Sequence, residues 1–148
     1  MNGRRALDAA LVALAIVSPA VSNAEGTATL TVQVTGALPG KGQAVFSLFT
    51  SKENFLREPY TTMTTPVDSN GKAVFHVKEL KPGTYAVSVY HDADNNGELN
   101  TGLFGVPTEL VGFSNQARSL FGPPSFRKAA FQIANEKEIG IRLGKAKD

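Results

Sequence analysis

The amino-acid sequence predicts an all-β protein, an antiparallel β-sandwich of about seven strands with a long ordered excursion between two late strands. Segments in which apolar and polar residues alternate recur along the chain, which is the pattern of strands with one buried face. Short turn sequences such as "PG" and "SNG" separate these segments, and only one short stretch has a helical pattern. Many short strands joined by tight turns are typical of two packed sheets.

The alternation is regular in most of the expected strands. In 27–34 apolar side chains alternate with threonine and glutamine, and Tyr85, Val87 and Val89 alternate in the same way after a Pro-Gly turn. The segment 60–68 carries a weaker signal. The strands are expected at 27–34, 43–50, 60–68, 72–80, within 80–92 after the Pro-Gly turn, at 127–135 and at 137–144.

The one helical stretch follows the second expected strand. Ser51 can cap a short helical turn, and Pro59 ends it. We expect this turn to carry Phe55 and Leu56 inward.

Residues 1–24 are expected to be a signal peptide, and 25–148 a single domain. Arg4 and Arg5 precede an apolar run, and Ser22 and Ala24 have the spacing that signal peptidase reads, so we expect cleavage after Ala24. The apolar run is too short for a permanent transmembrane helix, and no later segment is apolar enough to be an anchor. We therefore expect a periplasmic or secreted protein without a membrane span. The Arg pair leaves the twin-arginine export route open beside the general secretory route.

Charge and cysteine content exclude several classes of protein. Without residues 1–24 the chain has 13 basic and 12 acidic residues, a net charge of +1. So small an excess argues against a nucleic-acid partner, which would require a clustered basic face. The chain has 0 cysteines, so it has neither disulfides nor thiolate metal ligands.

The excursion, residues 92–125, has no clear period. It carries five of the 14 glycines and three of the nine phenylalanines, namely Phe104, Phe113 and Phe121. A long segment without strand or helix signals inside a small domain is often functional. We expect it to be compact, to pack over one end or one edge of a sheet, and to bury its aromatic rings.

The start of the excursion resembles half of a calcium-binding loop. Asp92, Asp94 and Asn96 occupy positions 1, 3 and 5 of a D-x-D-x-N-G string, and Gly97 permits the sharp turn at position 6. Such spacing directs successive side-chain oxygens at one centre. The alternative is a hydrogen-bonded turn in which the same side chains accept backbone N–H groups.

The rest of the candidate calcium site is less regular. Glu98 at position 7 would offer its backbone carbonyl, and Asn100 at position 9 could bind directly or through water. Position 12 is Leu103, where an EF-hand has a glutamate. Glu109 is the candidate for the missing carboxylate if the excursion folds back.

Two further chemistries use His91, which precedes the acidic residues. With Asp92 and Asp94 it could form a zinc site, although oxygen ligands favour a harder cation. With Asp92 and Ser114 it could form a hydrolase triad, although the "GFSNQ" around Ser114 is not a G-x-S-x-G elbow. Asn115 is expected to satisfy backbone groups. The second histidine, His76, is expected to be a half-exposed strand residue.

Several motifs resemble those of a family of exported bacterial proteins catalogued as domain-of-unknown-function family 2141. They are "GTYAV", H-D-x-x-x-N-G, G-x-P-x-E, "GFSN" and "GPPSF", which run from Gly83 to Phe126. Asn100 departs from the family pattern, in which aspartate is frequent. The resemblance implies a transthyretin/prealbumin-like or immunoglobulin-like sandwich and no established activity. The chain ends in "IGIRLGKAKD" and lacks the Tyr-Arg-Gly-Ser tail of the hydroxyisourate hydrolases, which are enzymes on such a sandwich.

These observations favour a non-enzymatic, exported interaction module. Its excursion, with or without calcium, would contact a carbohydrate, a peptide or a protein. The residues expected at that surface are His91, Phe104, Phe113, Ser114 and Asn115. A hydrolase and a structural envelope protein are the alternatives.

Overall fold

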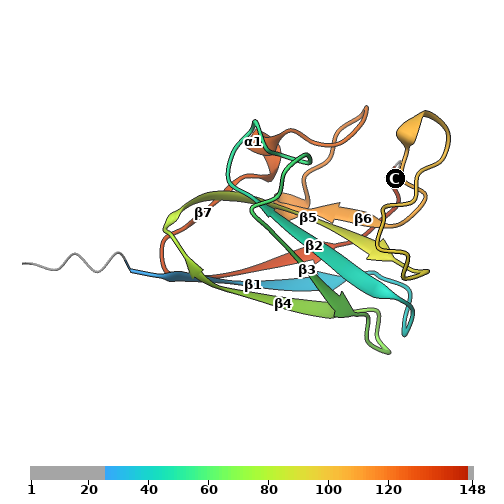
Figure 1. Cartoon of the computed structure of the whole chain (residues 1–148), viewed down its shortest axis with the longest axis horizontal. Coiled ribbons are helices and arrows are strands. Elements are labelled where there is room, and N and C mark those ends of the chain that lie inside the picture. The colour runs from blue at the N-terminus through green and yellow to red at the C-terminus, as the bar shows by residue number, and fades with distance from the viewer. Residues whose placement is uncertain (1–25, 147–148) are drawn as a thin grey trace, which may run out of the picture.

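The computed structural model describes residues 26–146, so the expected signal peptide and its cleavage site lie outside the described residues. Two β-sheets face each other, with the excursion and a short helix on the outer side of the larger sheet (Figure 1). This arrangement confirms the predicted β-sandwich. No helix within 26–146 is long and apolar enough to cross a membrane.

The described part of the chain has eight strands and three short helical segments. The strands are β1 (Ala28–Thr35), β2 (Gln43–Phe49), β3 (Thr61–Pro66), β4 (Ala73–Leu80), β5 (Gly83–Asp92), β6 (Val111–Phe113), β7 (Phe131–Ile133) and β8 (Glu136–Arg142). The helical segments are η1 (Leu103–Gly105), η2 (Ser114–Gln116) and α1 (Phe126–Ala129).

The smaller sheet has the order β4-β1-β8, and the larger has the order β3-β2-β5-β6, with β7 also paired to β5. All pairs are antiparallel except β1 and β8, which run parallel in register from Thr29↔Glu136 to Thr35↔Arg142. That pair departs from the expected antiparallel sandwich. Consecutive strands joined by a tight hairpin must pair antiparallel. β1 and β8 are the first and last strands, so no hairpin joins them and they can pair in parallel.

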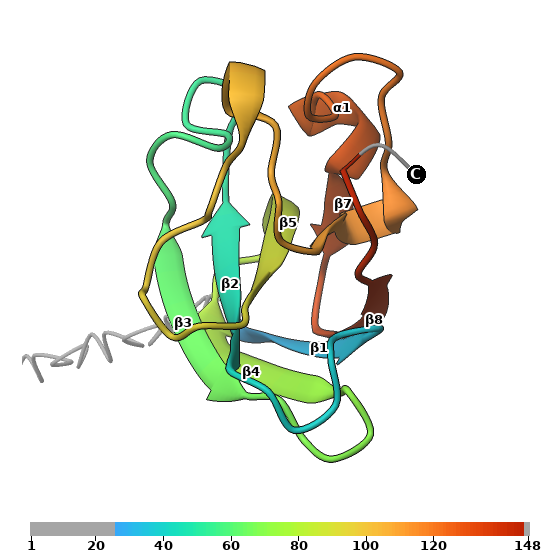
Figure 2. The ribbon, with the colours of Figure 1, turned by 90° about the vertical axis from the view of Figure 1, so that its right-hand side faces the viewer.

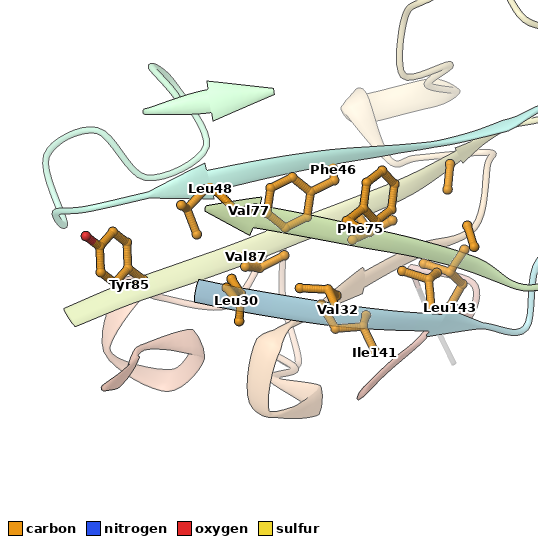
Figure 3. Packing of buried hydrophobic residues seen from close by; sticks show 14 of the residues in the cluster. Leu30, Val32, Phe46, Leu48, Phe75, Val77, Tyr85, Val87, Ile141 and Leu143 are labelled. Carbon is orange, nitrogen blue, oxygen red and sulfur yellow. The ribbon is translucent and has the colours of Figure 1, made fainter. Parts of the chain in front are cut away.

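The core lies between the two sheets (Figure 3). Alternate residues of each strand point inward, as the burial of β1 and β4 shows. Phe46 of β2 and Phe75 of β4 stack across the interface with their ring centroids 5.1 Å apart. These inward faces are the ones that the alternating pattern predicts.

A second, smaller cluster covers the outer face of the larger sheet. Ala86 of β5 points away from the main core and packs with Ala117 and Ala129. Phe113 and Phe126 are half-buried against this cluster. The end of the excursion and α1 are therefore anchored to the outside of the sandwich.

Parts of the expected secondary structure are corrected. Only three residues of 127–135 form a strand, because α1 occupies the start of that segment. The short β6 lies inside the excursion and has no sequence pattern that would predict it, since three residues are too few to define a period.

The expected helical turn after β2 exists as a single turn. Ser51 Oγ accepts a hydrogen bond from the Asn54 amide at 3.3 Å, as a cap would. Phe55 packs edge-on against Phe49 with centroids 5.2 Å apart. Leu56 has a φ of +59° and is 38% exposed, so its expected inward position is wrong.

The excursion is ordered and packs along the edge of the larger sheet, as expected, but it does not bury all its aromatic rings. Phe113 is half-buried, whereas Phe104 is 100% exposed and Phe121 is 91% exposed. The expectation of buried rings is therefore wrong for two of the three phenylalanines. Hydrogen bonds from polar side chains and the cluster around Phe113 and Ala117 hold this segment, so Phe104 and Phe121 are not needed for its packing.

Candidate metal centre

The candidate site begins where β5 ends. Asp92 is the last residue of β5 and lies opposite Gln43 in the β2–β5 ladder. Its side chain is 0% exposed. A buried carboxylate requires hydrogen-bond partners or a cation.

Asp92 accepts three hydrogen bonds. Gln43 Nε2 donates to Oδ2 at 2.8 Å, the Gly97 amide donates to Oδ2 at 2.9 Å, and the Asn96 amide donates to Oδ1 at 3.1 Å. Burial raises the pKa of the Asp92 carboxyl, but the hydrogen bonds, first that from Gln43, lower it by more, so its pKa lies below the ordinary value of 3.8. Asp92 is consequently ionised at neutral pH.

The turn between β1 and β2 approaches the end of β5 very closely. At Gly42, which has a φ of +58°, a Cβ atom would lie 2.1 Å from the Asp92 carbonyl oxygen. A residue with a side chain does not fit there, because its Cβ would collide with this oxygen and because the left-handed backbone favours glycine. Gly42 thus lets the turn deliver Gln43 to the Asp92 carboxylate.

Asp94 and two asparagines form a side-chain network beside Asp92. Asn96 Nδ2 donates to Asn100 Oδ1 at 2.8 Å, and Asn100 Nδ2 donates to Asp94 Oδ2 at 3.1 Å. The Asn96 amide also donates to Asp94 Oδ1 at 3.3 Å. Asp94, Asn96 and Asn100 are therefore brought together as the loop spacing predicts.

Residues 100–108 form a small hairpin, which we call the finger. The Thr108 amide donates to the Asn100 carbonyl at 2.9 Å, Thr101 bridges to Pro107, and η1 lies at the tip. The finger returns the chain to the loop and places Glu109 directly after its second arm.

Glu109 lies beside Asp92 and Asp94, because the excursion folds back as the sequence analysis requires. Its Oε1 accepts the Ala93 amide at 3.1 Å, and its Oε2 accepts the Asn100 amide at 3.0 Å. One carboxylate oxygen from each of Asp92, Asp94 and Glu109 lies within 4.8 Å of the others. The three carboxylates thus gather at the base of the finger.

The arrangement concentrates negative charge. Burial, followed by the negative charges of Asp92 and Glu109, raises the pKa of the neighbouring Tyr90 phenol. The Tyr90 hydroxyl donates to the Gly97 carbonyl at 3.2 Å. Three carboxylates so close together repel one another, and a cation among them would remove that repulsion.

This triad could bind a metal ion through oxygen. An ionised carboxylate has about four lone-pair sites, so an oxygen that accepts one backbone N–H can still bind a cation. The hydrogen-bonded turn that the sequence offered as an alternative is present in the structure. It also arranges the oxygens that a cation would use.

The other predicted residues have different positions. Glu98 is exposed, and its carboxylate is not in the triad, while its amide donates to Asn96 Oδ1 at 2.8 Å. His91 is 1% exposed, and its Nε2 donates to the Lys41 carbonyl at 2.8 Å. The imidazole is not among the clustered ligand groups of the described residues, so the geometry does not favour zinc.

Ser114 and Asn115 bind backbone groups. Ser114 is 0% exposed, and its hydroxyl donates to the Ala129 carbonyl at 2.6 Å and accepts the Val87 amide at 2.9 Å. His91 lies four residues along β5 from Val87, about 13 Å at the rise of a strand. The predicted Ser-His-Asp triad is therefore not assembled in this structure, and neither Ser114 nor buried His91 lies at an exposed surface.

Sequence reasoning missed the residues that reach the site from the β1–β2 turn. Gln43 and Gly42 lie some fifty positions before Asp92 in the chain, and only the pairing of β2 with β5 brings them to it. The "GKGQ" turn was a usable signal, because a glycine just before a strand can mark a close backbone approach.

The comparisons with known proteins agree with the sequence motifs. The model of a family described as "Uncharacterized protein conserved in bacteria (DUF2141)" matches residues 32–140. No curated protein and no solved structure matches the chain. The matched range includes β2 to β7, the second half of β1, most of β8, and the whole acidic triad. Since the match spans well over half of its residues, the chain belongs to the bacterial family DUF2141.

Proposed function

We propose that this domain is a non-enzymatic interaction module whose finger is fixed by a calcium ion bound to Asp92, Asp94 and Glu109. The observation that carries the proposal is the approach of these three carboxylates to within 4.8 Å of one another at the base of the finger. Calcium takes six to eight oxygen ligands, and Asn96, Asn100 and water can supply those that the carboxylates do not.

The position of the triad supports a role in ordering the finger. Asp92 and Asp94 precede the finger, and Glu109 follows it. A cation bound by all three would join the two ends of this segment. Without a cation, the hydrogen bonds from the Ala93 and Asn100 amides to Glu109 still join the two ends of the finger. They must then do so although the three carboxylates repel one another.

The affinity that we expect is weak. Only three carboxylates are available, two of them at least partly exposed, so we expect a dissociation constant on the order of 0.1–1 mM, as in extracellular modules. Such a site would be filled outside the cytoplasm, which agrees with the expected export of the protein to the periplasm or the medium.

The proposed partner is a carbohydrate, a peptide or a protein that contacts the outer end of the excursion. Within that segment, Phe104 is the predicted contact residue that is fully exposed. A hydrolase is not favoured, because Ser114 and His91 bind separate backbone groups.

The test is thermal unfolding in several millimolar calcium and in chelator. An ion that binds only the folded state adds about 2.7 kcal/mol at a hundredfold excess over its dissociation constant, so calcium should raise the melting temperature. The double variant Asp94→Asn with Glu109→Gln should lose this rise, because it removes two charges and keeps the size of both side chains.

Glu98→Gln is the matched control. It removes one charge from the same loop but lies outside the triad, so it should keep the calcium effect. Equal melting temperatures of the unmodified protein with calcium and with chelator would refute the proposal and leave a hydrogen-bonded turn.

A further inference from the structure

The tripeptide Leu-Phe-Gly occurs twice in the excursion, as Leu103–Gly105 and Leu120–Gly122. Both glycines have a φ of +70°, so each tripeptide ends in a residue with left-handed backbone. The four apolar side chains are 85–100% exposed: Leu103 85%, Phe104 100%, Leu120 95% and Phe121 91%. We call these two tripeptides the tips.

Both tips project from the same side of the molecule. In Figure 1 the tip of the finger and the loop before α1 rise above the larger sheet, and the smaller sheet lies below. Figure 2, turned by 90°, shows both at the top again, with the finger on the left and the loop before α1 on the right. Two separate loops thus present the same apolar pair in one direction.

The exposure of the tips contrasts with the rest of the protein. Elsewhere in 26–146, Phe46 and Leu48 lie in the core at 0% exposure, and no other leucine or phenylalanine is more than 47% exposed. Burying such a side chain is strongly favourable, and exposed apolar groups of this kind mark interaction sites. Phe104 has a φ of +60°, an uncommon conformation for this residue, and its ring is fully exposed.

The charge beside the second tip indicates the kind of surface that the tips contact. Arg127 and Lys128 are exposed on α1, directly after the loop that carries this tip. Lys128 Nζ donates to the carbonyl of Arg118, which lies just before the tip, so the basic side chain is held against this loop. Cationic groups beside protruding apolar side chains are complementary to an anionic bilayer, in which phosphate groups lie above the hydrocarbon.

We propose that the two tips insert into the surface of a bilayer that contains anionic lipids. Each tip is a narrow turn that projects outward, and a fluid interface accepts it without a preformed pocket. Leucine and phenylalanine enter the boundary between headgroups and acyl chains, and the basic residues bind the headgroups. Two tips on one rigid domain bind together more tightly than either would alone.

The acidic triad connects this inference to the proposed function. The finger carries the first tip and has three carboxylates at its base, which an anionic membrane repels. A bound calcium ion would neutralise that charge. The calcium dependence of membrane binding therefore rests on the proposed function, whereas the insertion of the tips does not.

The first experiment uses the absence of tryptophan from the chain. Phe104→Trp and Phe121→Trp each introduce a single indole at a tip, and Val74→Trp introduces one on β4, in the opposite sheet. Vesicles of phosphatidylcholine with phosphatidylglycerol should shift the emission of both tip variants to the blue and leave that of Val74→Trp unchanged. Unshifted emission in both tip variants would overturn the proposal and would direct the search to a protein partner.

The second experiment measures co-sedimentation with the same vesicles. Phe104→Ser with Phe121→Ser should lower the partition coefficient at least about tenfold. Arg127→Gln should lower it about fivefold on anionic vesicles and leave it unchanged on pure phosphatidylcholine. Val74→Ser should partition as the unmodified protein does. Equal partition of the double serine variant and the unmodified protein would refute insertion.

The two proposals can fail separately. The double serine variant should keep the calcium-induced rise in melting temperature, because its substitutions lie outside the triad. Asp94→Asn with Glu109→Gln should lose the calcium-dependent part of vesicle binding and keep the part that depends on the tips. If calcium changes neither melting nor vesicle binding while the tips still insert, the proposed metal site is wrong and the membrane inference stands.

Discussion

The sandwich core and the excursion use the same residue types in opposite ways. Phe46 and Phe75 stack in the centre of the sandwich, whereas Phe104 and Phe121 lie in solvent at the tips. The core is specified by apolar alternation along strands. The excursion is held mainly by polar side chains that bind backbone groups, and the apolar residues at its tips remain exposed.

Three consecutive residues show how the excursion is fastened to the sandwich. Ser114 bonds to β5 and to the end of α1, and Asn115 Nδ2 donates to the Lys128 and Ala130 carbonyls at 3.1 and 2.8 Å. Gln116 bonds to β8 through the Gly140 carbonyl and the Arg142 amide. The sequence "SNQ" thus joins the excursion to three separate elements, and the tips lie on either side of it.

The largest expected effect is on the free energy of unfolding, when one phenylalanine of the core and one of the excursion are each replaced by alanine. Phe46→Ala should lower the free energy of unfolding by about 3–5 kcal/mol, because it leaves a cavity against Phe75. Phe104→Ala should change it by no more than about 0.5 kcal/mol, since the ring is fully exposed. Urea denaturation of the two variants measures both values. Similar losses of stability in the two variants would show that Phe104 packs against the sandwich and would contradict the difference between core and excursion.

A smaller effect is expected from the polar fastening of the excursion. Ser114→Ala removes the hydroxyl that pairs the Val87 amide and the Ala129 carbonyl, both within the buried region around Ser114. The loss in free energy of unfolding should be about 1–3 kcal/mol. Hydrogen exchange should show faster exchange of the Val87 amide. A variant as stable as the unmodified protein would mean that these groups find other partners.

The smallest expected effect concerns the dependence of stability on pH. It comes from the titration of Asp92 and is seen only in acid. The folded-state pKa of Asp92 lies below the ordinary value of 3.8, so its ionised form adds stability above about pH 4. That contribution should be lost as the pH falls through the folded-state pKa.

Chemical denaturation in chelator at a series of acidic pH values measures this loss. Asp92→Asn should reduce the slope of stability against pH in this range, because the residue no longer titrates. Glu98→Gln, in the same loop, is the control and should keep the slope. An unchanged slope in Asp92→Asn would assign the acid sensitivity to other carboxyl groups.

Much of the sandwich could be predicted because each of the longer strands has a local sequence pattern of its own. The alternation in β1 and β5 fixes which residues face the core, and local turn residues fix where these strands begin and end. The short β6 and the parallel pairing of β1 with β8 depend on tertiary contacts, and no local pattern encodes them.

The candidate site was predictable to the extent that its spacing is local. Asp92, Asp94, Asn96 and Asn100 lie within one loop, and the need for a further carboxylate indicated Glu109. Gln43 and Gly42 could not be inferred, since their approach requires the β2–β5 register. The exposure of the tips differs from the expectation, because apolar residues are usually buried and no pattern in the sequence marks these four as exceptions.

The pairing of β1 with β8 has a consequence for how the chain acquires its structure. Residue 29 meets residue 136 in this pair, so the smaller sheet is completed only by the last strand of the described chain. Until β8 is available, β1 has one open edge, and Ile141 and Leu143 are missing from the core. Contacts between such distant segments form slowly, because the entropy of closing a long loop is lost before the contacts contribute any stabilising free energy. During synthesis, the domain therefore remains an incomplete sandwich, with one edge of β1 unpaired, until β8 has been made.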